Sequence, residues 1–176
     1  LREVATLERS FSGKLEIAEL TSAGLEETGD YAEGIALMEP YHGSLSRLSP
    51  GQGVRVRRLL GVHYRRAGQP QKALAIFEEC RRTADPVRDL KDLIFIDSEL
   101  AELYTYQAQY EEAEEACLRG LERLESLVGD GSFKIQMEIT LRATLGHLEL
   151  RRMALRRACR QLRSALSLAK STSVPA

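Results

Sequence analysis

The chain has 176 residues, about one ordinary domain or one stretch of a repeat array, and it is long enough to bury a sizeable core. With 43% hydrophobic residues, 29% charged residues and a formal net charge of -1, its composition excludes a disordered segment and indicates no partner by bulk charge. It contains no apolar run of about 18 residues and no basic-then-apolar N-terminal pattern. We therefore expect neither a membrane span nor a secretory leader, and a cytoplasmic location.

Helical periodicity predicts eight helices with turn-forming residues between them. In chain order they span residues 15–28, 31–47, 53–67, 70–83, 87–108, 110–127, 133–151 and 154–170. Asp85 and Ser132 are expected N-caps, since each has a side-chain oxygen that can accept from a helix amide. Residues 2–11 are predicted to be the last helix of an earlier hairpin. The first residue is Leu rather than Met, so we expect a piece of a longer polypeptide.

The most regular part of the chain is a helical hairpin between residues 53 and 84, with a Gly-Gln-Pro turn in its middle. The small residues Gly61 and Ala73 stand where two antiparallel helices would cross closely. Tyr64 and Phe77 are expected to fill the space between these helices. Related hairpins are predicted near residues 15–48, 87–128 and 133–170.

The order of small and large residues in this hairpin resembles the tetratricopeptide repeat (TPR). The best copy has Leu60, Gly61, Tyr64, Gly68, Ala73 and Phe77; the next has Leu100, Ala101, Tyr104 and Ala113, with Cys117 where an aromatic is usual; a third has Gly146 and Ala158, with Glu149 at an aromatic position. A degenerate copy with Gly34 and Met38 precedes them. The copies begin near residues 15, 54, 94 and 139, so the repeats are longer than the standard 34 residues. They resemble the long-repeat arrays of bacterial multidomain signalling regulators, and the 20 Arg against 5 Lys also favour a bacterial source.

This resemblance implies an all-α fold, a right-handed superhelix of antiparallel helical hairpins (a TPR-like α-solenoid), with residues 1–176 as one repeat domain. It also implies a concave groove lined by the first helix of each hairpin. The expected contact residues are Arg55, Arg58, Val62, Arg65 and Arg66; Phe95, Ser98, Glu102, Thr105 and Tyr106; Thr140, Ala143, His147 and Arg151; and Glu16, Glu19, Ala23 and Glu26. Such a groove suits an acidic peptide with an apolar anchor, because Arg holds carboxylates bidentately and an aromatic residue can receive the anchor.

Charge alternates along the chain in four bands. Residues 1–50 carry 4 basic and 9 acidic side chains, residues 51–83 carry 8 and 2, residues 84–140 carry 5 and 14, and residues 141–176 carry 8 and 1. One interpretation is that neighbouring hairpins of opposite sign attract each other within the molecule. The other is that a band selects a partner of opposite charge. Head-to-tail self-association follows from the same complementarity, because the two ends differ in sign.

No arrangement of residues points to catalysis. The phosphate-binding Walker pattern is absent, His42, His63 and His147 are scattered, and Cys80, Cys117 and Cys159 are expected to be reduced thiols without a catalytic partner. We therefore expect no enzyme activity, no metal and no cofactor. The chain has no Asn, which excludes the paired-asparagine clamp that some TPR proteins use for chaperone tails. The basic final helix has no aromatic residue and the pI is 6.4, so nucleic acid is not an expected partner.

The resemblance predicts a non-catalytic scaffold for protein–protein interaction, with a groove for a peptide or partner protein, as a segment of a bacterial signalling protein. The alternative is a ligand-sensing segment whose superhelix responds to a small molecule or peptide and controls an attached ATPase, kinase or DNA-binding domain.

Overall fold

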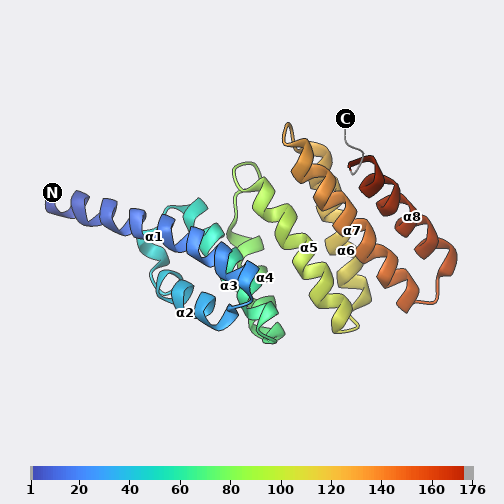
Figure 1. Ribbon diagram of the computed structural model, residues 1–176, viewed down its shortest axis with the longest axis horizontal. Coiled ribbons are helices and arrows are strands. Elements are labelled where there is room, and N and C mark those ends of the chain that lie inside the picture. The colour runs from blue at the N-terminus through green and yellow to red at the C-terminus, as the bar shows by residue number, and fades with distance from the viewer. Residues whose placement is uncertain (1, 173–176) are drawn as a thin grey trace. The chain divides into compact units, whose positions relative to one another are not determined.

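The computed structural model describes the backbone of residues 2–172 and the side chains of residues 11–171. This part of the chain contains helices and no strand, as Figure 1 shows, so the all-α prediction is confirmed. The helices are α1 (Arg2–Thr28), α2 (Tyr31–His42), the 3-10 helix η1 (Leu45–Arg47), α3 (Pro50–Arg66), α4 (Pro70–Thr83), α5 (Leu90–Tyr106), α6 (Tyr110–Ser126), α7 (Gly131–Arg151) and α8 (Leu155–Thr172).

The chain forms two compact units, residues 1–89 and residues 90–176. In unit 1, α1 pairs with α2 and α3 pairs with α4, while α3 also packs against α2 and α1. Its core is built from fully buried side chains of all four helices, including Leu15, Met38, Leu60 and Phe77. Each unit is therefore a pair of helical hairpins that share one apolar core.

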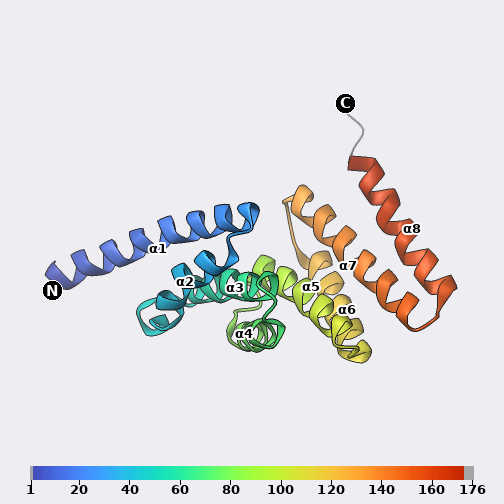
Figure 2. The ribbon, with the colours of Figure 1, turned by 60° about the horizontal axis from the view of Figure 1, so that its bottom comes forward.

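Unit 2 repeats this arrangement with α5 paired with α6 and α7 paired with α8. Figure 2 shows α7 and α8 as an antiparallel pair joined by a short loop. Helix α7 also packs against α6 and α5, and Ile94 and Leu100 of α5 and Leu141 and Leu148 of α7 are fully buried. Helix α8 packs on α7, and its residues Leu155, Cys159 and Leu166 remain exposed.

Glycines mark the closest helix crossings. A Cβ placed on Gly61 would lie 2.5 Å from Cε1 of Phe77, and one on Gly146 would lie 2.6 Å from Cδ2 of Leu162. Only a residue without a side chain permits these approaches. The other residues expected to pack the repeats lie in the same cores: Leu60, Tyr64, Ala73, Phe77, Leu100, Ala101, Tyr104, Ala113 and Ala158 are all buried. Gly68 instead occupies the α3–α4 turn with φ +73°.

Several local predictions were wrong. Residues 2–28 form one continuous helix rather than an earlier hairpin's helix followed by a new one at residue 15. Asp85 does not cap α5; its Oδ1 accepts from the amides of Val87 and Arg88 and closes a turn, so α5 begins only at Leu90. The N-cap of α7 is Asp130, which accepts from the amide of Phe133, and the Ser132 hydroxyl donates to Asp130 instead of capping.

The N-terminus of α3 shows a signal that the sequence prediction missed. The Ser49 hydroxyl accepts from the Gln52 amide, and the Gln52 side chain accepts from the Ser49 amide. This reciprocal capping box, with Pro50 in the first turn, starts the helix three residues before the predicted position. The predicted helix 31–47 in turn ends at His42, and η1 follows it.

Candidate functional site

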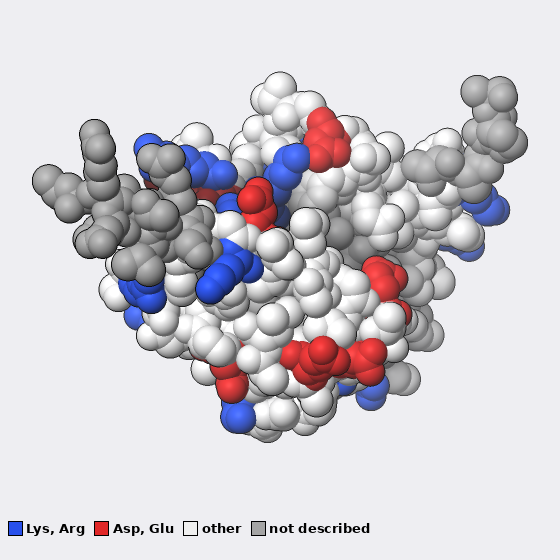
Figure 3. Space-filling view, turned by 60° about the vertical axis from the view of Figure 1, so that its left-hand side comes forward, with Lys and Arg blue, Asp and Glu red and all other residues white. Residues whose placement is uncertain are grey.

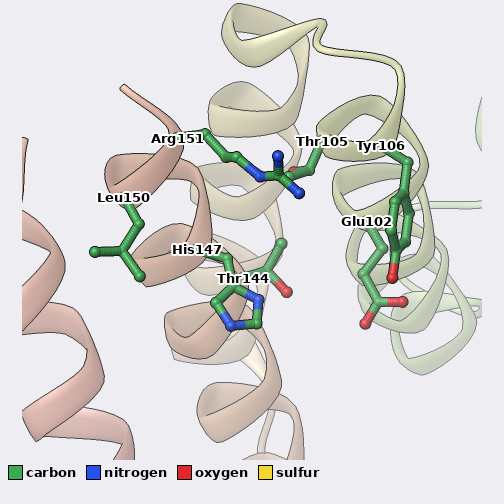
Figure 4. A pocket seen from close by; sticks show the side chains of 7 residues that line it. All are labelled: Glu102, Thr105, Tyr106, Thr144, His147, Leu150 and Arg151. Carbon is green, nitrogen blue, oxygen red and sulfur yellow. The ribbon is translucent and has the colours of Figure 1, made fainter. Parts of the chain in front are cut away.

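Unit 2 contains a hollow of about 380 Å³ between the first helices of its two hairpins. Glu102, Thr105 and Tyr106 of α5 line one side, and Thr144, His147, Leu150 and Arg151 of α7 line the other (Figure 4). On each helix these residues recur three or four positions apart, so they share one face. We call this site the unit 2 hollow.

The lining of the unit 2 hollow combines cationic, acidic and apolar groups. Figure 4 shows the Arg151 side chain reaching from α7 towards Thr105, with Tyr106 and Glu102 on the facing helix. Tyr106 is 81% exposed, and His147 and Arg151 are exposed as well. The hydroxyls of Thr105 and Thr144 already donate to backbone carbonyls of Ala101 and Thr140. Hydrogen-bond donors for a ligand therefore come mainly from Arg151, His147 and Tyr106.

A second hollow, in unit 1, brings α1 and α3 together. Its lining is Glu16, Glu19, Leu20 and Ala23 of α1 with Arg55, Arg58 and Leu59 of α3. The Arg55 guanidinium donates through Nε to a Glu19 carboxylate oxygen at 3.1 Å, so a carboxylate of the chain itself already pairs with it. This hollow is consequently less suited to an acidic ligand than the expected run of arginines indicated.

The other eight residues expected in the groove line neither hollow, and three of them, Glu26, Thr140 and Ala143, are half-buried. Val62 and Ser98 are buried because their positions on α3 and α5 face neighbouring helices, and the Ser98 hydroxyl donates to the Phe95 carbonyl. Arg65 and Phe95 are half-buried, Arg66 is exposed, and none of these five residues lines either hollow. The structure thus brings together two sets of the expected residues: Glu102, Thr105, Tyr106, His147 and Arg151 in the unit 2 hollow, and Glu16, Glu19, Ala23, Arg55 and Arg58 in the unit 1 hollow.

Ion pairs connect hairpins of opposite charge inside each unit. In unit 2, Arg152 at the end of α7 pairs with Glu111, at 3.1 Å, and with Glu114 of α6. In unit 1, Arg55 of the second hairpin pairs with Glu19 of the first. On the face shown in Figure 3, acidic and basic side chains form small groups rather than a field of one sign. Part of the alternating charge therefore serves contacts within the units.

Two buried polar centres were not foreseen. Asp97 of α5 is fully buried and pairs with Arg119 and Arg123 of α6; burial raises the pKa of its carboxyl against the pull of the two guanidinium groups. His63 of α3 is fully buried, with Nε2 2.7 Å from the Ser22 hydroxyl oxygen of α1, and burial lowers its pKa. Sequence offers no sign that a lone Asp or His on an apolar helix face has such a partner.

The described residues contain no group of three or more His, Cys, Asp or Glu side chains placed to hold a metal ion. Cys80 and Cys117 are buried free thiols, whereas Cys159 is an exposed free thiol. Among the helices of the described part, none has the length and apolar character needed to cross a bilayer.

Comparison with known proteins gives a likeness of fold. No family model and no curated protein matches the chain. Among solved structures, the crystal structure of BtubC (BKLC) from P. vanneervenii is similar, with a TM-score of 0.54 and 14% sequence identity over 96% of this chain and 92% of that chain. At this identity the likeness supports the all-helical fold alone.

Proposed function

We propose that the chain is a non-catalytic protein-interaction module, and that its unit 2 hollow binds a short acidic peptide segment with an apolar side chain. The observation that carries this proposal is the hollow itself, in which an exposed guanidinium, an exposed imidazole and an exposed aromatic ring converge from two hairpins. The resemblance to TPR arrays and the Arg-rich composition support a cytoplasmic bacterial regulatory protein as its setting.

Four residues of the hollow have roles in this proposal. The Arg151 guanidinium offers a fork that suits a carboxylate, and His147 one turn earlier adds a second donor. Tyr106 and Leu150, which are 81% and 40% exposed, provide the apolar surface for the anchor side chain. The unit 2 hollow is favoured over the unit 1 hollow because Glu19 pairs with Arg55 in unit 1, whereas the Arg151 guanidinium lies beside Thr105 and apart from Glu102, the acidic residue of the unit 2 hollow (Figure 4).

The test is a peptide array of acidic octamers that each carry one Leu or Phe, beside the same octamers with Lys in place of the acidic residues. We expect the acidic set to bind and Arg151→Glu to weaken binding by about 10–100-fold, since hydrogen bonds to charged groups contribute about 1.5–3 kcal/mol. The matched control is Arg82→Glu, because Arg82 is likewise an exposed arginine in the last turn of a helix. Equal binding of both peptide sets, or unchanged affinity in Arg151→Glu, would reject the proposal.

The size of the hollow supports a second candidate, the sensing of a small molecule. Its volume of about 380 Å³ lies within the range of small-molecule sites, about 300–1,000 Å³. Calorimetry with free aspartate, glutamate and succinate distinguishes the two. Stoichiometric binding of a free compound, with no tighter binding of any octamer, would favour a sensor that controls an attached domain.

A further inference from the structure

Helix α1 carries an exposed apolar stripe, one residue of which, Leu20, also lies at the edge of the unit 1 hollow. Gly13, Ile17, Leu20 and Gly24 recur at i, i+4, i+7 and i+11 and so lie on one helix face. Ile17 is 67% and Leu20 is 73% exposed, and a Cβ on Gly13 or Gly24 would meet nothing within 4 Å. The opposite face of the helix is the buried one, with Leu15, Ala18 and Ser22. We call the set of Gly13, Ile17, Leu20 and Gly24 the α1 stripe.

Helix α8 carries a stripe with the same spacing, formed by Leu155, Cys159, Leu162 and Leu166. Leu155 is 57% and Leu166 is 54% exposed, and Cys159 is exposed too. Leu162 is half-buried because it also packs on Gly146 of α7. We call this set the α8 stripe.

The two stripes have complementary sizes. The intervals of four, three and four residues are the same when read in either direction. A parallel or an antiparallel alignment therefore places Gly13 and Gly24 opposite Leu155 and Leu166. A large side chain over a glycine gives close helix packing without a void, as Phe77 does over Gly61 inside unit 1. Two α1 stripes together would leave gaps at their glycines, and two α8 stripes would oppose leucine to leucine.

The charged residues beside the stripes also favour pairing of an α1 stripe with an α8 stripe. Beside the α1 stripe the exposed charged residues are Lys14, Glu16 and Glu27, so carboxylates outnumber the one cation, whereas the α8 stripe is flanked by the exposed guanidinium groups of Arg156, Arg160 and Arg163. Like charges would repel in a contact between identical stripes, whereas opposite charges attract in a contact between different ones.

We infer that the α1 stripe of one copy binds the α8 stripe of a second copy, so that the protein self-associates head to tail. Such a contact is heterologous, and an assembly of any length keeps one unused stripe at each of its two ends. The unit 2 hollow shares no residue with either stripe, so this inference does not depend on the proposed peptide site.

The test is sedimentation velocity of the 176-residue chain from micromolar to millimolar concentration, at low and at high salt. We expect reversible, concentration-dependent assembly that weakens as salt screens the flanking charges. Ile17→Lys with Leu20→Lys disables the α1 stripe, and Leu155→Asp with Leu166→Asp disables the α8 stripe. Each double variant is expected to be monomeric, with the helical signal of the parent because all four sites are exposed. The control Val128→Lys changes an apolar residue that is 94% exposed outside both stripes, and it should assemble like the parent chain.

The decisive measurement mixes the two double variants in equal amounts. Each then contributes one intact stripe, and we expect a one-to-one dimer that grows no further. A parent chain that is monomeric at every concentration would overturn the inference and leave the stripes to other partners. Assembly of either double variant alone, or failure of the mixture to dimerise while the parent assembles, would overturn the pairing of α1 with α8.

Discussion

Gly61 provides the sharpest test of the helix packing. Helix propensity alone predicts that Gly61→Ala raises the free energy of unfolding, whereas the packing around Gly61 predicts that it lowers it. In an exposed helix interior, Ala is more stable than Gly by about 0.5–1 kcal/mol. At Gly61 the new Cβ would lie 2.5, 2.7 and 2.9 Å from three atoms of the Phe77 ring. All three distances are well inside van der Waals contact, and Phe77 has no exposed surface through which its ring can move away.

The magnitude follows from these two opposing contributions. Overpacking a well-filled core costs about 1–3 kcal/mol, and three close ring atoms put Gly61→Ala in the upper half of that range. Subtracting the gain of up to about 1 kcal/mol in propensity leaves a loss of about 1–2 kcal/mol in the free energy of unfolding. Gly61→Leu adds three more carbons at the same crossing and should cost more.

Urea unfolding followed by circular dichroism measures this loss, and a double-mutant cycle with Phe77→Leu assigns it to the contact. If the ring causes the clash, Gly61→Ala should be less destabilising in the Phe77→Leu background. Gly24→Ala is the matched control, since nothing lies within 4 Å of its added Cβ, and it should stabilise the chain at concentrations where it is monomeric. A stabilised Gly61→Ala variant, or additive effects of the two substitutions, would refute this account of the crossing.

Three other predictions concern buried and exposed side chains. Burial lowers the pKa of His63 below its ordinary 6.5, so as the pH falls the unfolded chain binds a proton before the folded chain does. The contribution of neutral His63 to the free energy of unfolding is therefore fully present above pH 6.5. Below pH 6.5 that free energy declines by up to about 1.4 kcal/mol per pH unit. Urea titrations at about pH 7.5 and 5.5 should show that decline, and His63→Gln should reduce it. Burial, with Asp97 nearby, raises the pKa of the Cys117 thiol to about 12, so a thiol reagent should label Cys159 in the native protein and all three cysteines only after unfolding. Asp97→Ala should cost about 2–3 kcal/mol in urea unfolding, less than for a fully buried pair, because its two arginine partners are about a quarter exposed and can regain water.

Sequence predicted the helices well where an apolar period and a turn signal coincide. The α3–α4 hairpin illustrates this, because Gly68 and Pro70 mark its turn and Gly61 marks its crossing. The wrong predictions concern helix starts, where local hydrogen bonds determine which of several similar polar residues caps the helix. Asp85, Asp130 and Ser132 are all plausible caps, and only the conformation of the chain around them determines which amide each one meets.

The site was predictable only in part, since periodicity gives a residue's face but not what that face meets. Tyr106, His147 and Arg151 were expected in a groove and line the unit 2 hollow. Val62 and Ser98 were expected there too, yet neighbouring helices bury them. A shift of one position around a helix, about 100°, separates a lining residue from a core residue, and an expected register is not accurate enough to resolve it.

Glycine shows most clearly why sequence and structure carry different information here. Gly61 and Gly24 both lie inside helices, and the sequence predicted a close helix approach only at Gly61. In the structure Phe77 covers Gly61, whereas Gly24 has no atom near the place of its missing side chain. Gly61 is thus covered by a helix crossing inside the unit, whereas Gly24 is open to contact with a leucine of another molecule. The contrast between a covered and an uncovered glycine is therefore what turns the apolar pattern of α1 into a testable interface.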